Sequence, residues 1–333
     1  MIQPWFWLPA RISHALSGVG VEAAACLTSS PRNIKNFQWR DFQWRNVHFR
    51  NPLGIAGGLD KNAEHMLAWQ KLGAGFLEIG TITPKPQKGN PGSVIDRDLR
   101  QKALWNKMGF PSKGSDFVLH KVKQADLNIP LFINIGKNRE TPLEKAGGDY
   151  VFLAQKFHQQ AQALVINISS PNTPGLRSLG QAASLKGWLK DVIQAAPSTP
   201  VLLKLSPDMN ELDFSQTVEL AVQEGIAGFI LTNTTTFRAP YLHFPSEGGV
   251  SGLPLREKSL QALSQIQNLL GSQRSSLLIV SCGGVMTSED VFDRLEKGAD
   301  LVQTYSALVF NGPGFLKDVA QEWKETKSLE KRD

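Results

Sequence analysis

The sequence predicts an α/β fold, a (β/α)₈ TIM barrel with an N-terminal helical extension. Eight short apolar runs recur along the chain, and most are followed by a longer segment with apolar residues at helical spacing. Strands that alternate with amphipathic helices form parallel sheets, and eight such units close a barrel. The predicted strands are 53–56, 76–79, 131–135, 163–168, 201–205, 228–231, 277–281 and 300–304. Helical spacing occurs at Leu185, Trp188, Leu189, Val192 and Ile193, and at Leu260, Leu263, Ile266 and Leu270.

An open, doubly wound sheet is the alternative arrangement of the same elements. Its first strand would run into a G-x-G-x-x-G turn, but the strand at 53–56 runs into Gly57-Gly58-Leu59-Asp60, which does not match. A chain of 333 residues is long enough for one barrel, which takes roughly 250 residues, or for two medium domains, so the length alone does not decide between the folds. The barrel is therefore the favoured fold.

The composition is that of an ordinary soluble globular protein, with 41% hydrophobic and 20% charged residues. The two cysteines, Cys26 and Cys282, form no CxxC or Cys/His pattern, and the six histidines include no HxxxH pair. A disulfide framework and a zinc site are therefore not predicted, and no metal ligand is assigned. Nucleic-acid binding is not expected either, because no recognition module is present.

We expect two parts in the chain, a helical extension over 1–38 and the barrel over 39–333. The barrel part opens with a predicted hairpin over 39–49, where aromatic residues and Val47 alternate around a polar Arg45-Asn46 turn. The stretch from 80 to 130, between the second and third strands, is far longer than a median loop of roughly 4 to 6 residues. Long loops of this kind predict functional segments at the barrel mouth.

The first 50 residues are basic and rich in tryptophan. They carry six basic side chains against two acidic ones, and they include Trp5, Trp7, Trp39 and Trp44. Aromatic rings and cationic side chains favour the headgroup layer, so the extension is predicted to dock on a membrane surface. The alternative is a helical cap packed on the chain's own barrel. No apolar run approaches the roughly 20 residues that cross a bilayer, and no signal-peptide pattern is present.

Polar side chains crowd the carboxyl ends of two predicted strands, the edge that carries active sites in TIM barrels. Turn chemistry alone would explain a proline-rich segment with serine and asparagine. A turn does not require the two asparagines that flank Ser-Ser-Pro. Their amides supply paired donors and acceptors, which suit a planar polar ligand. The two groups are Asn167-Ile168-Ser169-Ser170-Pro171-Asn172-Thr173-Pro174-Gly175-Leu176-Arg177 and Thr232-Asn233-Thr234-Thr235.

Lys204 is a charged residue inside the apolar strand at 201–205. Burying an unpaired ammonium is costly, so Lys204 needs either a partner anion or a chemical task. The simpler explanation is a structural carboxylate partner.

A glycine pair follows the first predicted strand. Asp60-Lys61 comes after Ala56-Gly57-Gly58, whose glycines allow a flat ligand to approach the backbone closely.

The turns after the last two strands predict a phosphate site. Ser281-Cys282-Gly283-Gly284 and Tyr305-Ser306 each end a strand, and these are the usual phosphate positions in TIM barrels. A glycine turn without a ligand is the alternative. A phosphate site, a lysine and several amides at one barrel mouth, without metal ligands or histidine, suit FMN, whose ring carries out redox chemistry.

From about Asn51 to Gly314 the chain resembles the dihydroorotate dehydrogenases, more specifically the membrane-associated class 2, which passes electrons to quinone. The matching motifs occur in family order, and NISSPNTPGLR is highly specific. The resemblance implies oxidation of (S)-dihydroorotate to orotate in pyrimidine (UMP) biosynthesis, with electrons passing from FMN to a quinone. The motifs are NPLGIAGGLDKN, EIGTITPKPQKGNP, NKMGF, INIGKN, NISSPNTPGLRSL, TNTT, GGVSGLPL and LVQTYSALVFNGP.

The same resemblance implies roles for individual residues. Ser170 matches the catalytic base, which removes a proton from C5 of the substrate while hydride leaves C6 for flavin N5; the soluble class has cysteine there. Thr173 would help to lead the proton away, and Lys204 would stabilise the reduced ring near N1. The residues implied to hold FMN are Ala56, Gly57, Gly58, Thr81, Asn134, Asn167, Lys204, Thr232, Ser251, Gly252, Gly283, Gly284, Tyr305 and Ser306. Those implied to surround the substrate are Lys61, which would meet its carboxylate, and Asn106, Lys107, Met108, Gly109, Phe110, Asn167, Asn172, Asn233 and Thr234.

In this class two N-terminal helices form a hydrophobic tunnel towards the flavin and dock on the membrane, which fits the extension over 1–38. The implied location is peripheral, on the cytoplasmic side of the membrane, or of the inner membrane in a bacterium. The chain departs from the family pattern over 92–97, where only Arg97 remains of an arginine- and phenylalanine-rich segment. Lys107 replaces an arginine and Pro111 an asparagine beside the substrate loop. These departures concern the quinone tunnel more than the FMN site.

Two other functions fit parts of the pattern. A Schiff-base aldolase on the same barrel would use Lys204 as its nucleophile. A non-catalytic or altered-specificity flavin-binding homologue would keep the FMN site without this reaction.

Overall fold

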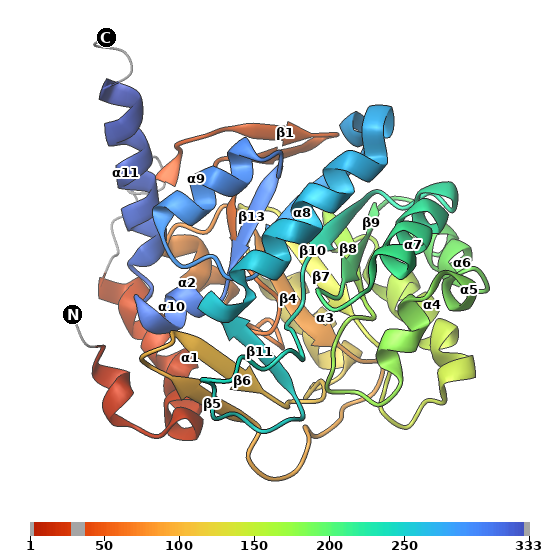
Figure 1. Cartoon of the computed structure of the whole chain (residues 1–333), viewed down its shortest axis with the longest axis horizontal. Coiled ribbons are helices and arrows are strands. Elements are labelled where there is room, and N and C mark those ends of the chain that lie inside the picture. Colours follow the sequence, from red (N-terminus) through yellow and green to blue (C-terminus); the bar gives the residue numbers. More distant parts are fainter. Residues whose placement is uncertain (1–2, 28–36, 330–333) are drawn as a thin grey trace.

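Eight parallel strands close into a barrel at the centre of the molecule (Figure 1). The computed structural model describes residues 3–27 and 37–329. Around the barrel the strands follow the order β10-β12-β13-β3-β4-β7-β8-β9, and each pairs in parallel with its neighbours. Their bounds are β3 Leu53–Ile55, β4 Leu77–Ile82, β7 Leu131–Ile135, β8 Ala163–Asn167, β9 Val201–Leu205, β10 Gly228–Leu231, β12 Leu278–Cys282 and β13 Leu301–Thr304. The predicted barrel and its eight strands are confirmed.

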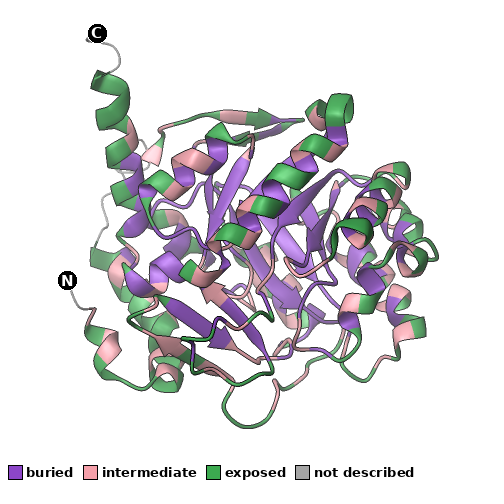
Figure 2. Cartoon of the chain, in the orientation of Figure 1, coloured by how far each residue is buried: buried purple, intermediate pink, exposed green. Residues whose placement is uncertain are grey.

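The barrel strands are buried on both faces, which is why the sequence shows them as continuous apolar runs. All residues of β7, β8 and β9 are buried. Figure 2 shows these strands beneath helices whose outer faces are exposed. One set of side chains fills the barrel interior, and the alternate set packs against the helices. Two charged side chains inside this apolar interior, Glu78 and Lys204, are exceptions that need an explanation.

Helices cover the barrel between successive strands. Two begin with local caps: the Asn210 side chain accepts from the N–H of Asp213 at α7, and Thr287 and Asp290 form a capping box at α9. The helices are α2 Met66–Lys71, α3 Ser115–Gln124, α4 Ala146–Phe157, α5 Ala182–Leu185, α6 Leu189–Gln194, α7 Glu211–Gln223, α8 Arg256–Leu270, α9 Ser288–Glu296, α10 Ser306–Phe310 and α11 Phe315–Leu329. Short 3₁₀ turns are η3 Leu143–Lys145, η4 Leu176–Gly180, η5 Leu253–Leu255 and η6 Gly271–Ser276.

The predicted helical spacing from 185 to 193 is divided between two short helices. α5 ends at Leu185 and α6 begins at Leu189, because the backbone of Trp188 leaves helical geometry (φ −147°, ψ −14°). The Trp188 indole stacks on the Tyr150 ring of α4, with centroids 4.9 Å apart and planes 12° apart. This tertiary contact favours the break over a continuous helix. The spacing at 260–270 lies within α8, as predicted.

A hairpin closes the amino end of the barrel. β1 Phe42–Trp44 and β2 Val47–Phe49 pair antiparallel, with Trp44 opposite Val47 across the Arg45-Asn46 turn. The Phe49 ring packs against Phe76 and Phe132, with centroids 5.8 and 6.2 Å away, near the amino ends of β4 and β7. The predicted hairpin is confirmed.

A second small sheet, which we name the lid sheet, lies over the carboxyl end of the barrel. It consists of β5 Ile95–Asp98, β6 Ala103–Asn106 and β11 Gly249–Gly252, paired antiparallel in the order β11-β6-β5. The sequence marks the stretch from 80 to 130 as long loops and predicts no strand there. The lid sheet is therefore a feature that only the structure shows.

The N-terminal extension packs on the chain's own barrel. It consists of η1 Pro4–Trp7 and α1 Ala10–Leu27, and α1 lies against α2 and β5. The Trp5 indole N–H donates to the carbonyl of Val309 (2.8 Å), and the Phe6 ring lies 5.9 Å from that of Phe310. Residues 28–36, which contain Arg32 and Lys35, two of the six basic residues among the first 50, lie outside the described residues. Within residues 3–27 and 37–329, no helix has the length and apolarity needed to span a bilayer.

Candidate active site

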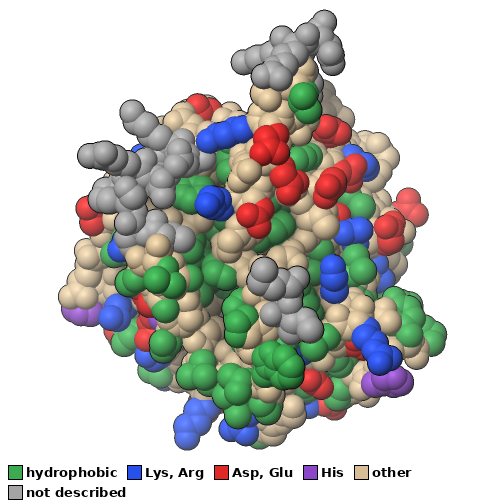
Figure 3. Space-filling view, turned by 90° about the vertical axis from the view of Figure 1, so that its left-hand side faces the viewer, with side chains coloured by type: hydrophobic (Ala, Val, Ile, Leu, Met, Phe, Trp, Pro, Cys, Tyr) green, Lys and Arg blue, Asp and Glu red, His purple; other side chains and the backbone are tan. Residues whose placement is uncertain are grey.

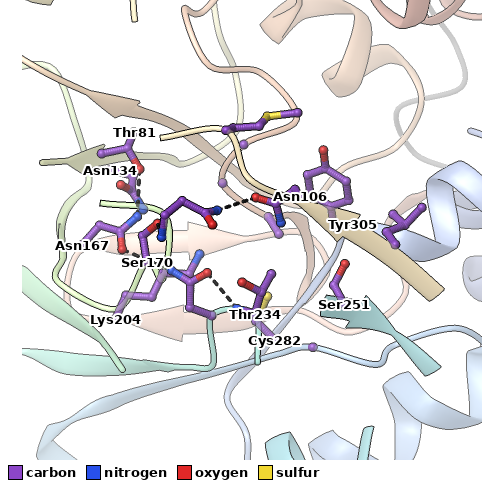
Figure 4. Close-up of a pocket in the computed structure, with 18 of the residues that line it drawn as sticks. Thr81, Asn106, Asn134, Asn167, Ser170, Lys204, Thr234, Ser251, Cys282 and Tyr305 are labelled. Atoms are coloured by element: carbon purple, nitrogen blue, oxygen red, sulfur yellow. Dashed lines mark hydrogen bonds between the residues drawn. The ribbon is translucent and has the colours of Figure 1, made fainter. Parts of the chain in front are cut away.

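A cavity opens at the carboxyl end of the barrel, and every barrel strand or the turn after it contributes to its wall (Figure 4). We name it the mouth cavity. The lid sheet supplies Ile95, Leu104, Trp105, Asn106 and Ser251 to the same wall. The sequence-predicted residues that line it are Ala56, Gly57, Gly58, Lys61, Thr81, Asn106, Met108, Gly109, Phe110, Asn134, Asn167, Ser170, Asn172, Lys204, Thr232, Asn233, Thr234, Ser251, Gly283, Gly284, Tyr305 and Ser306. The fold thus brings together residues that are far apart in the chain.

Three predicted site residues lie off the cavity wall. Thr173 is buried at the turn into η4, where its carbonyl accepts from the N–H of Leu176 (3.1 Å). Gly252 has φ +85°, and a Cβ there would stand 2.1 Å from the carbonyl oxygen of Lys102, so this glycine allows close pairing within the lid sheet. Lys107 turns to the surface and forms an ion pair with Glu247.

The serine predicted as the base lies in the mouth cavity. Ser170 is 5% exposed, and its Oγ accepts a hydrogen bond from the N–H of Asn172 (3.2 Å). Asn172 donates from Nδ2 to Oδ1 of Asn106 (2.7 Å), which joins the Ser170 loop to the lid sheet. The Ser170 hydroxyl is therefore held by its own loop.

Side-chain amides form a connected group beside Ser170. Asn167 Nδ2 donates to Thr81 Oγ1 (2.8 Å; Figure 4). Asn233 Nδ2 donates to Asn167 Oδ1 (3.2 Å). The hydroxyl of Tyr150 on α4 donates to the backbone carbonyl of Asn167 (3.0 Å). Each amide is thus oriented by a neighbour, so the cavity presents donors and acceptors in fixed directions.

Lys204 has a buried carboxylate partner. Its Nζ lies 2.9 Å from Oε1 of Glu78, and the two side chains are 6% and 0% exposed. Burial works to lower the pKa of Lys204, but the charge of Glu78 and its hydrogen bond outweigh burial and hold the pKa above its usual value. Lys204 is therefore a cation at neutral pH. Because a Schiff base needs a neutral amine, this pairing disfavours the aldolase hypothesis.

Lys61 stands at the opposite wall of the mouth cavity in a tightly held turn. Its Nζ donates to the carbonyl of Gly58 (2.7 Å), and the Asp60 carboxylate accepts from the N–H groups of Glu64 and His65 (2.8 Å each). Burial lowers the pKa of Lys61 to about 8, although the charge of Asp60 acts in the opposite direction. Burial and the charge of Lys61 lower the pKa of His14 on α1 to about 4. The N-terminal extension contacts this same turn, where Glu22 Oε1 of α1 lies 3.1 Å from Nδ1 of His65.

Arg177, the last residue of the predicted polar group, forms a clamp with Asp208, a residue that the sequence did not single out. Arg177 donates from Nε to the carbonyl of Ser169 (3.0 Å), from Nη2 to that of Thr234 (2.8 Å) and from Nη1 to Asp208 Oδ2 (2.8 Å). Burial works to raise the pKa of Asp208, but hydrogen bonds from Thr235, Thr236 and Arg177 outweigh it and hold the pKa below its usual value. The clamp fixes the Ser170 loop to the Thr232–Thr235 loop. Asp208 follows the strand that carries Lys204, so the strand-end rule could have found it.

Arg97, the residue retained from the altered segment, holds the N-terminal extension. From β5 it donates to the carbonyls of Trp5 (3.2 Å), Phe6 (3.3 Å) and Leu8, and to Ser13 Oγ (3.1 Å). Arg97 thus adds donors to the carbonyls at and just after the end of η1. One of them, that of Trp5, also accepts from the N–H of Leu8 (3.3 Å) and from Ser13 Oγ (2.7 Å). The extension is thus attached to the lid sheet as well as to α10.

The residues present fit a flavin. Among the described residues, Asn134 Oδ1 and Gln303 Oε1 are buried without a hydrogen-bond partner, and both residues line the mouth cavity beside Lys204. Free acceptors and a cation suit the polar edge of a planar heterocycle with N–H and carbonyl groups. Gly283 (φ +113°) and Gly284 (φ +71°) line the far end of the cavity, where a Cβ on Gly284 would stand 2.3 Å from the Arg256 backbone. The described residues contain no cluster of His, Cys, Asp or Glu that could bind a metal ion.

The comparisons with known proteins point to one family. The family described as dihydroorotate dehydrogenase matches residues 41–326. The chain is 40% identical to dihydroorotate dehydrogenase (quinone) from Cellvibrio japonicus, over 81% of this chain and 81% of that protein. It is 38% identical to the protein of the same name from a Sulfurovum species, over 92% of this chain and 87% of that protein.

A solved structure agrees in fold. DHODH from Eimeria tenella in complex with ferulenol is 30% identical in sequence and superposes with a TM-score of 0.83, covering 94% of this chain and 90% of that chain. The family match, residues 41–326, includes every barrel strand and every residue that lines the mouth cavity. The chain belongs to the dihydroorotate dehydrogenase family.

Proposed function

We propose that the chain oxidises (S)-dihydroorotate to orotate in pyrimidine biosynthesis, with FMN as the bound flavin and a quinone as the electron acceptor. The observation that supports this best is one cavity that combines a held serine hydroxyl, oriented amides and two lysines at opposite walls. The relatives named dihydroorotate dehydrogenase (quinone) support the same substrate and acceptor.

The side chains divide the work between substrate and flavin. As Ser170 takes the proton from C5 of the substrate, its own hydroxyl proton passes to water. Lys61 binds the substrate carboxylate. The side-chain amides of Asn106, Asn172 and Asn233 meet the polar ring edge of the substrate. The flavin, when bound, supplies the electron-accepting ring. The Lys204 cation favours the negative charge of the reduced ring.

We assign the flavin as FMN because the far end of the mouth cavity suits a single phosphate. Gly283 and Gly284 form a turn there, beside Tyr305 and Ser306 at the start of α10. The hydroxyl of Ser306 donates to that of Ser251 on the lid sheet (3.3 Å), so two hydroxyls stand together at this end. Turns after the last two strands of a TIM barrel are a common phosphate site. Gly252 and Thr173 would act indirectly, by shaping the lid sheet and the Ser170 loop.

The function predicts two separable half-reactions. Anaerobic addition of dihydroorotate to the yellow protein is expected to bleach the visible flavin band and to release one orotate per flavin. The reason is that the flavin is then the sole acceptor for the two electrons that leave the substrate. Reoxidation should then be fast with a soluble quinone and at least tenfold slower with fumarate or NAD. Spectra that stay unchanged on addition of dihydroorotate would favour the non-catalytic homologue instead.

We also propose that the extension over 1–38 docks the enzyme on a membrane surface, on the cytoplasmic side, where quinone is available. One face of α1 leaves Ile12, Leu16 and Val19 47%, 51% and 69% exposed, at the i, i+4, i+7 spacing of an apolar stripe. Trp7 on η1 is 81% exposed. Figure 3, which looks onto this side of the molecule, shows hydrophobic side chains spread over the lower part of the face.

Polar substitutions on this stripe should weaken membrane binding. The triple variant Ile12→Ser/Leu16→Ser/Val19→Ser is expected to lower binding to phospholipid vesicles at least tenfold, because each lost side chain removes apolar area that would leave water. Reduction of the flavin by dihydroorotate should be unchanged, whereas reaction with vesicle-embedded quinone should slow. Leu212→Ser on α7, where Leu212 is 64% exposed, is the matched control and should bind as the parent does. Equal binding by all three proteins would contradict the docking proposal.

A further inference from the structure

Glu78 is a buried carboxylate that takes no part in the proposed binding of substrate or in the proton transfer. It lies on β4, its side chain is 0% exposed, and three donors from three other strands converge on it. Oε1 accepts from Lys204 Nζ (2.9 Å, β9) and Asn134 Nδ2 (2.5 Å, β7), and Oε2 accepts from Gln303 Nε2 (2.7 Å, β13). In the barrel order, β9 and β13 are not neighbours of β4. The carboxylate therefore reaches across the barrel interior.

Glu78 lies directly beneath the floor of the mouth cavity. It does not line the cavity itself, but all three of its donors do. A Cβ built on Gly57, another lining residue, would stand 2.4 Å from Glu78 Oε1. Gly57 is thus a glycine that leaves room for the carboxylate below it, and the charge of Glu78 is close to whatever occupies the cavity.

The pair of Glu78 and Lys204 makes the cavity floor nearly neutral. Each charge alone would be costly to bury, and removing one partner leaves the other uncompensated. A floor with Lys204 alone would carry a net positive charge, and positive charge beside a flavin favours the reduced ring, which gains negative charge. Interactions at such short range in a buried site are weakly screened.

We propose that Glu78 is a positioning residue that holds Lys204 and offsets its charge, and that it thereby lowers the reduction potential of the bound flavin. The inference rests on the proposed function, because it requires a flavin in the mouth cavity. A lower potential would ease the passage of electrons from the reduced flavin to the acceptor. Glu78 would then act through Lys204 without touching substrate or flavin.

The Glu78→Gln variant removes the charge and can keep all three hydrogen bonds. The carbonyl of the introduced amide would accept from Lys204 and Asn134. The NH₂ group of the same amide would donate to Gln303 if the Gln303 amide turns over, and Gln303 Oε1 is at present without a partner. The size of the side chain is unchanged. The variant is therefore a test of charge rather than of packing.

The experiment is a spectroelectrochemical titration of purified, flavin-loaded protein. It is done at pH 6, because a low pH favours the protonated form of Lys204 after the charge of Glu78 has been removed. In Glu78→Gln, the ratio of reduced to oxidised flavin at a fixed potential should rise about tenfold or more, which is an upward shift of about 30 mV for two electrons. The control variant Glu322→Gln, on the exposed face of α11, removes one negative charge at a position away from the cavity. It should leave the potential unchanged. A merely structural role for Glu78 would not move the potential in a variant that still binds flavin.

A second variant keeps the inference testable if Glu78→Gln does not fold. Glu78→Gln/Lys204→Gln has a neutral floor again, so its reduced-to-oxidised ratio should lie within about tenfold of the parent. If this ratio fell more than tenfold below that of the parent, Lys204 would act in the parent as a cation whose charge Glu78 does not offset. That result would overturn the inference. So would a parental potential in flavin-loaded Glu78→Gln. Parent protein that contains no flavin and takes up none would instead overturn the proposed function, and this inference with it.

Discussion

Replacing Ser170 with alanine is expected to slow the reduction of bound flavin by dihydroorotate by about 10²- to 10⁴-fold, the usual contribution of a positioned acid or base. Ser170 is a hydroxyl that lines the cavity and is held by the N–H of Asn172 at 3.2 Å. Alanine removes the hydroxyl to which we assign the proton transfer, without creating a large void. Stopped-flow mixing of oxidised enzyme with dihydroorotate under anaerobic conditions measures this step alone.

Two companion variants separate base chemistry from loop structure. Ser178→Ala changes an exposed hydroxyl in the same loop, one that donates to the carbonyl of Gly175 (2.7 Å), and should reduce flavin at the parental rate. Ser170→Cys places a more acidic group at the same position and should retain more activity than Ser170→Ala, most of all at high pH. Flavin content should match the parent in all three. Parental reduction rates in Ser170→Ala would remove Ser170 from the mechanism.

The fold is predictable to the extent that burial is continuous along the chain. Each barrel strand is covered on both faces and therefore appears as an apolar run, which fixes eight strands and their order. β5 carries the sequence Ile95-Asp96-Arg97-Asp98, and none of these residues is fully buried. β5 pairs with β6, and β6 pairs with β11, which lies about 150 residues further along the chain. Both pairings depend on contacts that no local pattern reveals.

The site is predictable to the extent that it lies at strand ends. The strand-end rule and the family resemblance together place Ser170, Asn167 and Asn233 near one another, and the structure brings them to one cavity. Glu78 escapes this rule because it lies inside a strand, between Leu77 and Ile79. Lys204 has the same setting in its own strand, so two lone charges of opposite sign in apolar runs could have suggested the pair. The structure confirms the simpler explanation of Lys204, a carboxylate partner, and leaves room for a chemical task as well.

The substitution Lys61→Met is expected to lower kcat/KM for dihydroorotate by roughly 10²- to 10³-fold, mainly through KM, because loss of one partner of a buried charge pair costs about 2–5 kcal/mol. Lys61 lines the mouth cavity and is held by the carbonyl of Gly58 at 2.7 Å, so its ammonium is already placed for a carboxylate. Methionine has a similar length and no charge. Steady-state rates over a range of dihydroorotate concentrations separate the KM effect from that on kcat.

The pH profile tests the same assignment without a comparison of absolute rates. Burial lowers the pKa of Lys61 to about 8, so the side chain is a cation below pH 8 and becomes neutral above it. Because kcat/KM reports groups of the free enzyme, it should fall up to about tenfold per pH unit above about pH 8 in the parent. Lys61→Met has no proton to lose and should lack this fall, and Lys61→Arg should lack it while keeping part of the activity, since a guanidinium stays charged. If the fall persisted in Lys61→Met, it would belong to another group, and the contact between Lys61 and the substrate carboxylate would lose its support.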